Sequence, residues 1–301
     1  MAKRNHSLAF PVLKPILQVS FFYLLPSLRK RYLQDALRST MTGLQVASVD
    51  KELSASVAPG ALSKVAGFGI RGEVFFAIPC LLRANPFLLG YYRLLLGFSQ
   101  KEFYNKGPFG RFKHLEEKGL IAARIDREVD QLSNCLVKSA EYLVERLDEL
   151  SPTAVADLQL LTVGPQLRGG ENTRIGREAT KEVFNLIKSV AGRSVRETTA
   201  STISVQNAAG RMVLIEFLSD PDVRITEKLP TGMRRIVSME VKGGADASNI
   251  HNRLGEAEKS HLKAKDLGFF EFWTILRVDL DTEEAPGISD HKPLLLPGQN
   301  Q

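Results

Sequence analysis

Cysteine is scarce in this sequence, and the two residues present, Cys80 and Cys135, show no C-x-x-C spacing and have no histidine nearby at ligand spacing. This argues against a disulfide scaffold and a cysteine-based zinc site, so we expect two buried, reduced thiols. Long apolar runs are also missing, because the run over residues 19–25 is short and no small-residue cleavage pattern precedes the basic residues 29–31. We therefore expect a cytoplasmic protein with no membrane partner.

The motifs of several common enzyme classes are absent as well. The sequence has no G-x-x-x-x-G-K-[ST] phosphate loop and no H-E-x-x-H zinc motif. The glycines of residues 67–72 imitate a dinucleotide fingerprint, but no strand pattern precedes them and their spacing is short. We interpret residues 57–72 as a turn region and expect no nucleotide cofactor.

What the sequence does contain is an ordinary globular composition with a basic balance. Hydrophobic residues make up 44% and charged residues 25% of the 301 residues, and the formal net charge is +6. A chain of this length can bury a substantial core in one or two domains. The positive charge favours a polyanionic partner, although many basic proteins bind no nucleic acid.

The first half of the chain has the periodicity of helices. Apolar residues recur at helical spacing over residues 28–49, the strongly apolar residues 86–98 predict a buried helix, and residues 115–150 predict a long helical region. Ser151-Pro152 ends that pattern. We therefore predict a mainly helical region over residues 1–150.

The second half alternates between helix and strand patterns. After a glycine-rich polar loop at 166–172 we predict, in order, a helix at 173–190, strands at 201–206, 212–218, 223–226 and 236–242, a helix at 248–265, a strand at 269–278 and a loose tail from 281. The last helix is the crossover between two parallel strands. The chain is therefore predicted to be an α/β (α+β) protein, with a mixed central sheet flanked by helices in residues 151–301.

Two short motifs in this half carry chemistry. Asp222 follows a proline and opens one strand, and Glu240-Val241-Lys242 ends the next. Side chains alternate along a strand, so Glu240 and Lys242 share a face while Val241 points to the core. Mg²⁺ binds oxygen ligands, and the carboxylates of Asp222 and Glu240 with the carbonyl of Val241 would supply them.

Lys242 would then orient or deprotonate an attacking water and balance the charge of a phosphate in the transition state. This arrangement predicts a metal-dependent DNA endonuclease. The bare motif is weak and also fits a surface hairpin with a Glu–Lys pair, but the surrounding strands, helices and basic charge favour the catalytic interpretation. We consider Glu182, in preference to Glu178, as a third acidic residue; a solvated helix face is the alternative.

Two polar segments are candidates for DNA binding. Arg168, Asn172, Arg174 and Arg177 surround a predicted helix start, where backbone N–H groups bind phosphate; a plain capping loop is the alternative. The other candidates open the helix after the motif and have the residue types that pair with base edges, with a polar cap as the alternative. They are Asn249, His251, Asn252 and Arg253.

The order helix, Pro-Asp, Glu-x-Lys, helix and strand resembles the PD-(D/E)XK nuclease core. Residues 240–246 and 248–261, with residues 89–98 in the first half, resemble type II restriction endonucleases of the XcyI-like family, and the resemblance covers most of the chain. It implies a restriction-endonuclease-like fold, with 151–301 as the catalytic core and 1–150 serving recognition, dimerisation or support. It also implies a homodimer that uses Mg²⁺ to cut double-stranded DNA at a short palindromic, GC-rich site, although the residues alone do not show the palindrome.

Two other functions remain open at this point. The first is a non-catalytic, sequence-specific DNA-binding protein that uses the same basic surface. The second is a repair or recombination nuclease of the same superfamily. The presence of Asp222, Glu240 and Lys242 together favours an enzyme over a binding module, and the large helical first half favours a dedicated endonuclease.

Overall fold

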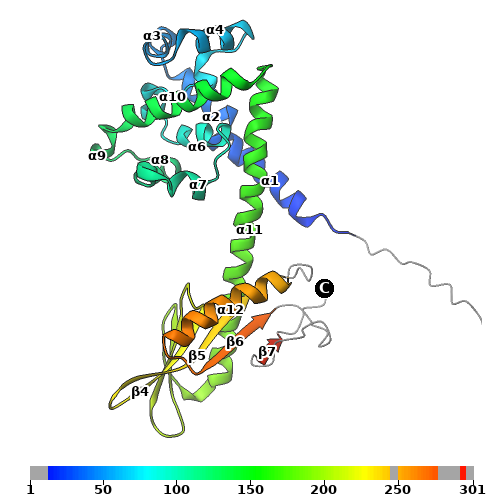
Figure 1. Ribbon diagram of the computed structural model, residues 1–301, viewed down its shortest axis with the longest axis vertical. Helices are drawn as coiled ribbons and strands as arrows, with labels where there is room; N and C mark the ends of the chain where they lie inside the picture. Colours follow the sequence, from blue (N-terminus) through cyan, green and yellow to red (C-terminus); the bar gives the residue numbers. More distant parts are fainter. Residues whose placement is uncertain (1–12, 245–249, 277–291, 296–301) are drawn as a thin grey trace, which may run out of the picture. The chain divides into compact units, whose positions relative to one another are not determined.

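The structure, a computed structural model, describes residues 13–244, 250–276 and 292–295 (Figure 1). The chain divides into two compact units, residues 1–168 and 169–301. The division lies within the long helix α11 (Pro152–Ala191), which contributes residues to both units, and not at Ser151-Pro152. None of the described helices combines the length and apolar composition that crossing a membrane requires.

The first unit is helical and is built around α6 (Leu88–Leu95), every residue of which is buried. The other helices of this unit are α1 (Ile16–Tyr32), α2 (Gln34–Thr42), α3 (Val46–Ser56), α4 (Pro59–Gly67), α5 (Pro79–Ala84), α7 (Gln100–Tyr104), α8 (Lys113–Lys118), α9 (Ala123–Asp126) and α10 (Val129–Arg146). The hydroxyls of Tyr91 and Tyr92 donate to the carbonyls of Val74 and Glu73 at 3.0 and 2.7 Å. The two aromatic rings can therefore be buried without leaving a hydroxyl group that lacks a hydrogen-bond partner.

A charged pair lies inside this helical core. Arg93 of α6 donates from Nε and Nη2 to the two oxygens of Glu116 on α8, at 2.8 and 2.7 Å. Gln100 and Tyr104 also donate to the same carboxylate, at 2.8 and 2.6 Å. Both charged side chains are only 1% exposed. A bidentate pair with two further donors is the arrangement that makes a buried charge tolerable.

Several sequence predictions for this unit are wrong in detail. The expected turn region contains α4, which starts with a proline in its first turn and buries Val65. The expected helix at 115–150 is interrupted because Gly119 ends α8 with a left-handed conformation (φ 65°). The helix at 28–49 is divided among α1, α2 and α3. The thiols are free, but Cys80 is only partly buried and Cys135 is exposed.

The second unit contains a sheet of seven strands in the described part of the chain, in the order β1 to β7. The strands are β1 (Val195–Thr198), β2 (Thr202–Gln206), β3 (Met212–Phe217), β4 (Val223–Leu229), β5 (Gly232–Lys242), β6 (Glu271–Leu276) and β7 (Lys292–Leu295). The first five are antiparallel neighbours, whereas β5, β6 and β7 are parallel. The predicted mixed sheet is therefore confirmed, and α12 (Ile250–Asp266) is the predicted crossover. The sequence reading missed β1, and β7 falls in the tail expected to be loose.

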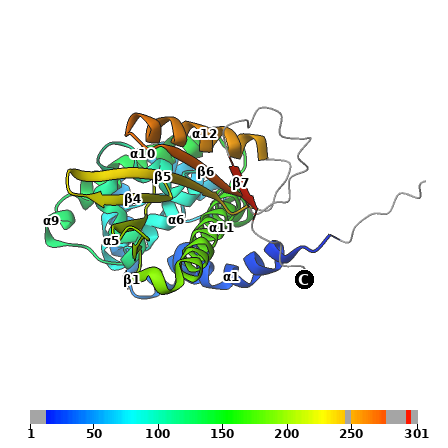
Figure 2. The same cartoon turned by 90° about the horizontal axis from the view of Figure 1, so that it is seen from below.

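Two helices cover opposite faces of this sheet (Figure 2). Val237, Met239 and Val241 of β5 form a core cluster with Ala179 and Val183 of α11. The alternate residues of β5 face α12, as the contact between Glu240 and Ser260 demonstrates. The predicted orientation of Val241 to the core is therefore confirmed.

Helix α11 runs without a break through the segment predicted to be a loop. Pro165 and the glycines at 169 and 170 favour an interruption, because proline costs about 3 kcal/mol and glycine about 1 kcal/mol inside a helix. The buried side chains of Val155 and Val163 before these glycines, and of Ala179 and Val183 after them, anchor α11 on both sides. Tertiary packing therefore outweighs the local propensities, and the predicted helix start at residue 173 is wrong.

Candidate functional site

The ends of β4 and β5 bring the two predicted carboxylates together. Val223, the first residue of β4, pairs with Met239 of β5, so Asp222 continues toward the end of β5. Its Oδ2 accepts a hydrogen bond from the backbone N–H of Val241 at 2.8 Å. The Asp222 side chain thus occupies the position beside β5 where the next residue of the ladder would lie.

Glu240 and Lys242 lie on the same face of β5, as their alternation predicts. Lys242 Nζ is 3.2 Å from Glu240 Oε2, and the Lys242 side chain is 20% exposed while that of Glu240 is 8% exposed. A residue in a ladder directs its N–H and C=O to the same neighbouring strand. The carbonyl of Val241 therefore faces the side from which Asp222 approaches, together with the Val241 N–H.

The electrostatics of Asp222 are unusual for a carboxylate. Burial is the largest cause of a rise in its pKa to about 6, and the negative charge of Glu240 adds to the rise. The N–H of Val241 and the charge of Lys242 oppose the rise only in part. At neutral pH the site holds two carboxylates at a cost in stability, which a bound cation would relieve.

We expect Asp222→Asn to stabilise the metal-free protein at neutral pH. The folded-state pKa of Asp222 lies above its ordinary value, so the folded state loses stability as the pH rises from about 4 to about 6. An amide imitates the protonated acid and removes that loss, which is on the order of 2 kcal/mol at pH 7.5 once solvent screening of this partly exposed group is allowed for. Denaturant unfolding in EDTA at pH 7.5 and about pH 4 measures the difference, which should be present at the higher pH and vanish at the lower.

Asp220→Asn is the matched control for this change. Bonds from Ser260 and Lys263 lower the pKa of the exposed Asp220, so its charge favours the folded state and its loss should not stabilise the protein. A variant Asp222→Asn that is no more stable than the parent at pH 7.5 would contradict the electrostatic argument.

Helix α12 adds residues to the site that the sequence reading missed. Ser260 Oγ lies 2.6 Å from Glu240 Oε1 and 2.9 Å from Asp220 Oδ1. Lys263 Nζ lies 3.3 Å from Asp220 Oδ2. The buried residues Ala257, His261 and Ala264 mark the inner face of α12. That helical spacing is the signal that could have placed Ser260 toward the sheet.

The donor set suits a small divalent cation. Two carboxylates and one backbone carbonyl are hard oxygen ligands, and Mg²⁺ uses one or two carboxylates with waters and a phosphate. The structural observation that favours a cation is the placement of the Asp222 and Glu240 side chains at the ends of adjacent strands, with Asp222 bonded to the Val241 N–H and Glu240 only 8% exposed; the raised pKa of Asp222 agrees with it. Within the described ranges, no group of three or more Asp, Glu, His or Cys side chains is arranged to hold a metal.

The predicted third acid lies on the helix across the sheet. Gly243 packs directly against α11, because a Cβ there would collide with Ala179 and approach the carbonyl of Ile175 at 3.0 Å. Glu182 is three residues beyond Ala179 and therefore on the same side of α11. Glu178 instead forms an ion pair with Arg174. A role for Glu182 in the site stays a prediction.

The first predicted DNA-binding segment is part of a helix and not a helix start. Arg168, Asn172, Arg174 and Arg177 lie on exposed positions inside α11, where backbone N–H groups are bonded within the helix. Phosphate binding by a helix N-terminus is therefore wrong for this segment. Arg174 is also held by Glu171 at 2.6 Å and by Glu178. Contacts from these side chains to DNA stay a prediction.

The second segment is described only in part. Asn249 and the side chain of His251 lie outside the described residues, and Asn252 is exposed on α12. Arg253 donates from Nη1 to the carbonyl of Gly244 at 2.5 Å, and its guanidinium lies where a Cβ on Gly244 would stand. Arg253 therefore has a structural contact at the end of β5, and its reading of bases stays a prediction.

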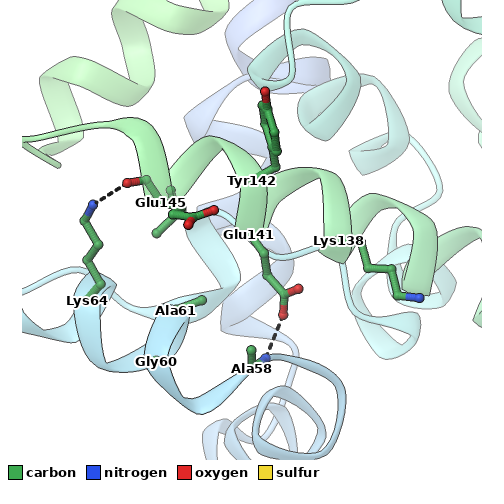
Figure 3. A pocket seen from close by; sticks show the side chains of 9 residues that line it. Ala58, Gly60, Ala61, Lys64, Lys138, Glu141, Tyr142 and Glu145 are labelled. Atoms are coloured by element: carbon green, nitrogen blue, oxygen red, sulfur yellow. Dashed lines mark hydrogen bonds between the residues drawn. The ribbon is translucent and has the colours of Figure 1, made fainter.

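A groove of about 410 Å³ in the first unit lies between α4 and α10 (Figure 3). The Ala58 N–H donates to Glu141 Oε1 at 2.7 Å, and Lys64 Nζ donates to the carbonyl of Glu145 at 3.0 Å. Glu141 and Glu145 line the groove with Lys64 and Lys138, but the Glu141 carboxylate is bonded to a backbone N–H and the Lys64 ammonium to a backbone carbonyl, so these side chains serve the packing of α4 on α10. We therefore place the candidate active site at β5.

Comparison with known proteins gives a consistent result. The family described as XcyI restriction endonuclease matches residues 23–290. The type II restriction enzyme XcyI of Xanthomonas campestris pv. cyanopsidis is 45% identical over 270 residues, which are 88% of this chain and 81% of that enzyme. The type II restriction enzyme Cfr9I of Citrobacter freundii is 43% identical over 288 residues, 93% of this chain and 87% of that enzyme. No solved structure matches.

Proposed function

This chain belongs to the XcyI restriction endonuclease family, and from that premise we propose that it hydrolyses both strands of DNA at a short palindromic, GC-rich site with Mg²⁺ as cofactor. The observation that carries the chemistry is the meeting of Asp222, Glu240 and Lys242 at the ends of β4 and β5. Cutting both strands of a palindrome suits a two-fold symmetric enzyme, so we propose a homodimer.

In the proposed reaction Asp222, Glu240 and the carbonyl of Val241 would hold the cation. When bound, Mg²⁺ would lower the pKa of a water molecule and neutralise negative charge on the phosphate. Lys242 orients the attacking water, and its ammonium stabilises the negative charge that develops on the phosphate. Its partial exposure lets the ammonium reach a substrate while Glu240 holds it at 3.2 Å.

The test is cleavage of plasmid and phage DNA by the purified protein in Mg²⁺, with EDTA as the control. We expect discrete bands that EDTA abolishes, and sequencing of the ends gives the site. A smear would indicate a repair or recombination nuclease instead. Intact DNA that shifts in a native gel would indicate a non-catalytic DNA-binding protein.

A further inference from the structure

Ser260 connects two carboxylates that come from different parts of the chain. Its hydroxyl lies 2.6 Å from Glu240 Oε1 on β5 and 2.9 Å from Asp220 Oδ1, just before β4. Lys263, one turn further along α12, lies 3.3 Å from the other oxygen of Asp220. The contacts therefore run from Lys263 through Asp220 and Ser260 to Glu240.

A serine hydroxyl has one proton, so it donates to one of these carboxylates at a time. Asp220 is 55% exposed, is paired with Lys263 and can accept from water. Glu240 is 8% exposed, and a buried carboxylate oxygen without a donor costs more than an exposed one. The proton therefore belongs to the shorter contact, with Glu240.

This donation fixes the orientation of the Glu240 carboxylate. Oε1 is held by Ser260 from α12, and Oε2 is held by Lys242 from the same strand. Without the hydroxyl, the carboxylate could rotate about its terminal torsion, which is broad for glutamate. Partners of this kind around a metal ligand commonly determine its affinity for the metal.

We propose that Ser260 is a positioning residue for Glu240, to which its hydroxyl donates from α12. The inference rests on the proposed function, because it takes Glu240 as a ligand of the divalent cation. On this proposal, metal binding depends on Ser260 of α12 as well as on the residues of β4 and β5. Ser260 thereby influences cleavage from a helix outside the Asp222 and Glu240 strands, without itself contacting the reacting atoms.

The first experiment measures Mn²⁺ binding to the full chain without DNA, by titration calorimetry. We expect Ser260→Ala to weaken Mn²⁺ binding by about tenfold. Ser139→Ala is the matched control, since Ser139 is a partly exposed helical serine of α10 whose hydroxyl donates to the carbonyl of Cys135 at 3.0 Å, far from Glu240 in the sequence. It should bind Mn²⁺ as the parent does.

A double-mutant cycle separates positioning from general structural damage. If Ser260 acts through Glu240, Ser260→Ala should have no further effect on Mn²⁺ affinity in the Glu240→Gln background. Single-turnover cleavage in Mg²⁺ should fall by about tenfold or more for Ser260→Ala, while DNA affinity in EDTA stays within about twofold.

Parent-like Mn²⁺ affinity in Ser260→Ala would overturn the proposal, as would an equal loss in the parent and Glu240→Gln backgrounds. In either case the proposed function stands if Glu240→Gln itself binds Mn²⁺ measurably more weakly than the parent and loses cleavage. If the parent cleaves no DNA and Glu240→Gln binds Mn²⁺ normally, the proposed function fails and the positioning role fails with it.

Discussion

Replacing Lys242 with alanine should reduce the rate of DNA cleavage by about 10³-fold, with DNA affinity within about threefold of the parent value. The Lys242 ammonium lies 3.2 Å from Glu240 Oε2 at the partly exposed end of β5, where no other lysine of the described chain contacts the Glu240 carboxylate. Truncation therefore removes the positive charge and the proton donor or acceptor of the site together. Asp222→Ala should have a similar effect, because it removes a proposed metal ligand.

Single-turnover cleavage in Mg²⁺ and equilibrium binding of the same duplex in EDTA measure the two quantities separately. Lys228→Ala is the matched control: Lys228 is exposed on β4, and its loss removes the same charge from the same unit. It should cut at the parent rate. Cleavage by Lys242→Ala at the rate of Lys228→Ala would refute the proposed mechanism, and a parallel loss of DNA affinity would reassign Lys242 to binding.

The sequence was sufficient for the part of the site that depends on a single strand. Alternation along β5 places Glu240 and Lys242 on one face and Val241 in the core, and the structure has this arrangement. The parallel pairing of β5 and β6 followed from the helix between them, because a parallel pair needs a long crossover. Local sequence patterns are therefore enough to predict these features.

The contacts of Ser260 could not be predicted in the same way. Ser260 is separated by 20 residues from Glu240 and by 40 from Asp220, and no local pattern encodes side-chain meetings at such separations. Their geometry depends on how α12 packs on the sheet. A helical wheel of α12 would have shown Ser260 on the inner face, but not which acid it meets.

The errors along α11 and near Gly119 have opposite causes. Pro165 and the following glycines are local signals for a loop, yet buried residues anchor one continuous helix there. At Gly119 an apolar period suggested continuity, yet a single left-handed glycine ends α8. The loop-forming tendency of proline and glycine was given too much weight in α11 and too little at Gly119. Only the tertiary packing decides whether such a residue interrupts a helix.

The buried pair between Arg93 and Glu116 leads to the largest stability effect that we expect. Glu116→Gln leaves the Arg93 guanidinium, 1% exposed, without a counter-charge, and breaking a buried pair typically costs about 3–5 kcal/mol. Burial alone would raise the pKa of Glu116, but bonds from Arg93, Gln100 and Tyr104 outweigh it and lower the pKa. The stabilisation is therefore present at neutral pH and lost as the pH falls through the folded-state pKa.

Denaturant unfolding of the full chain at pH 7.5 measures this loss, and hydrogen exchange in α6 and α8 localises it. Glu117→Gln is the matched control. Glu117 is the next residue in the chain, and its carboxylate forms an exposed ion pair with Lys113 at 3.2 Å, a kind of pair that typically contributes about 0–1 kcal/mol. The double change Arg93→Met with Glu116→Leu should recover part of the stability, since it leaves no unpaired charge, while the Tyr104 hydroxyl loses its acceptor. Equal effects of Glu116→Gln and Glu117→Gln would show that the Arg93–Glu116 pair does not stabilise the helical unit.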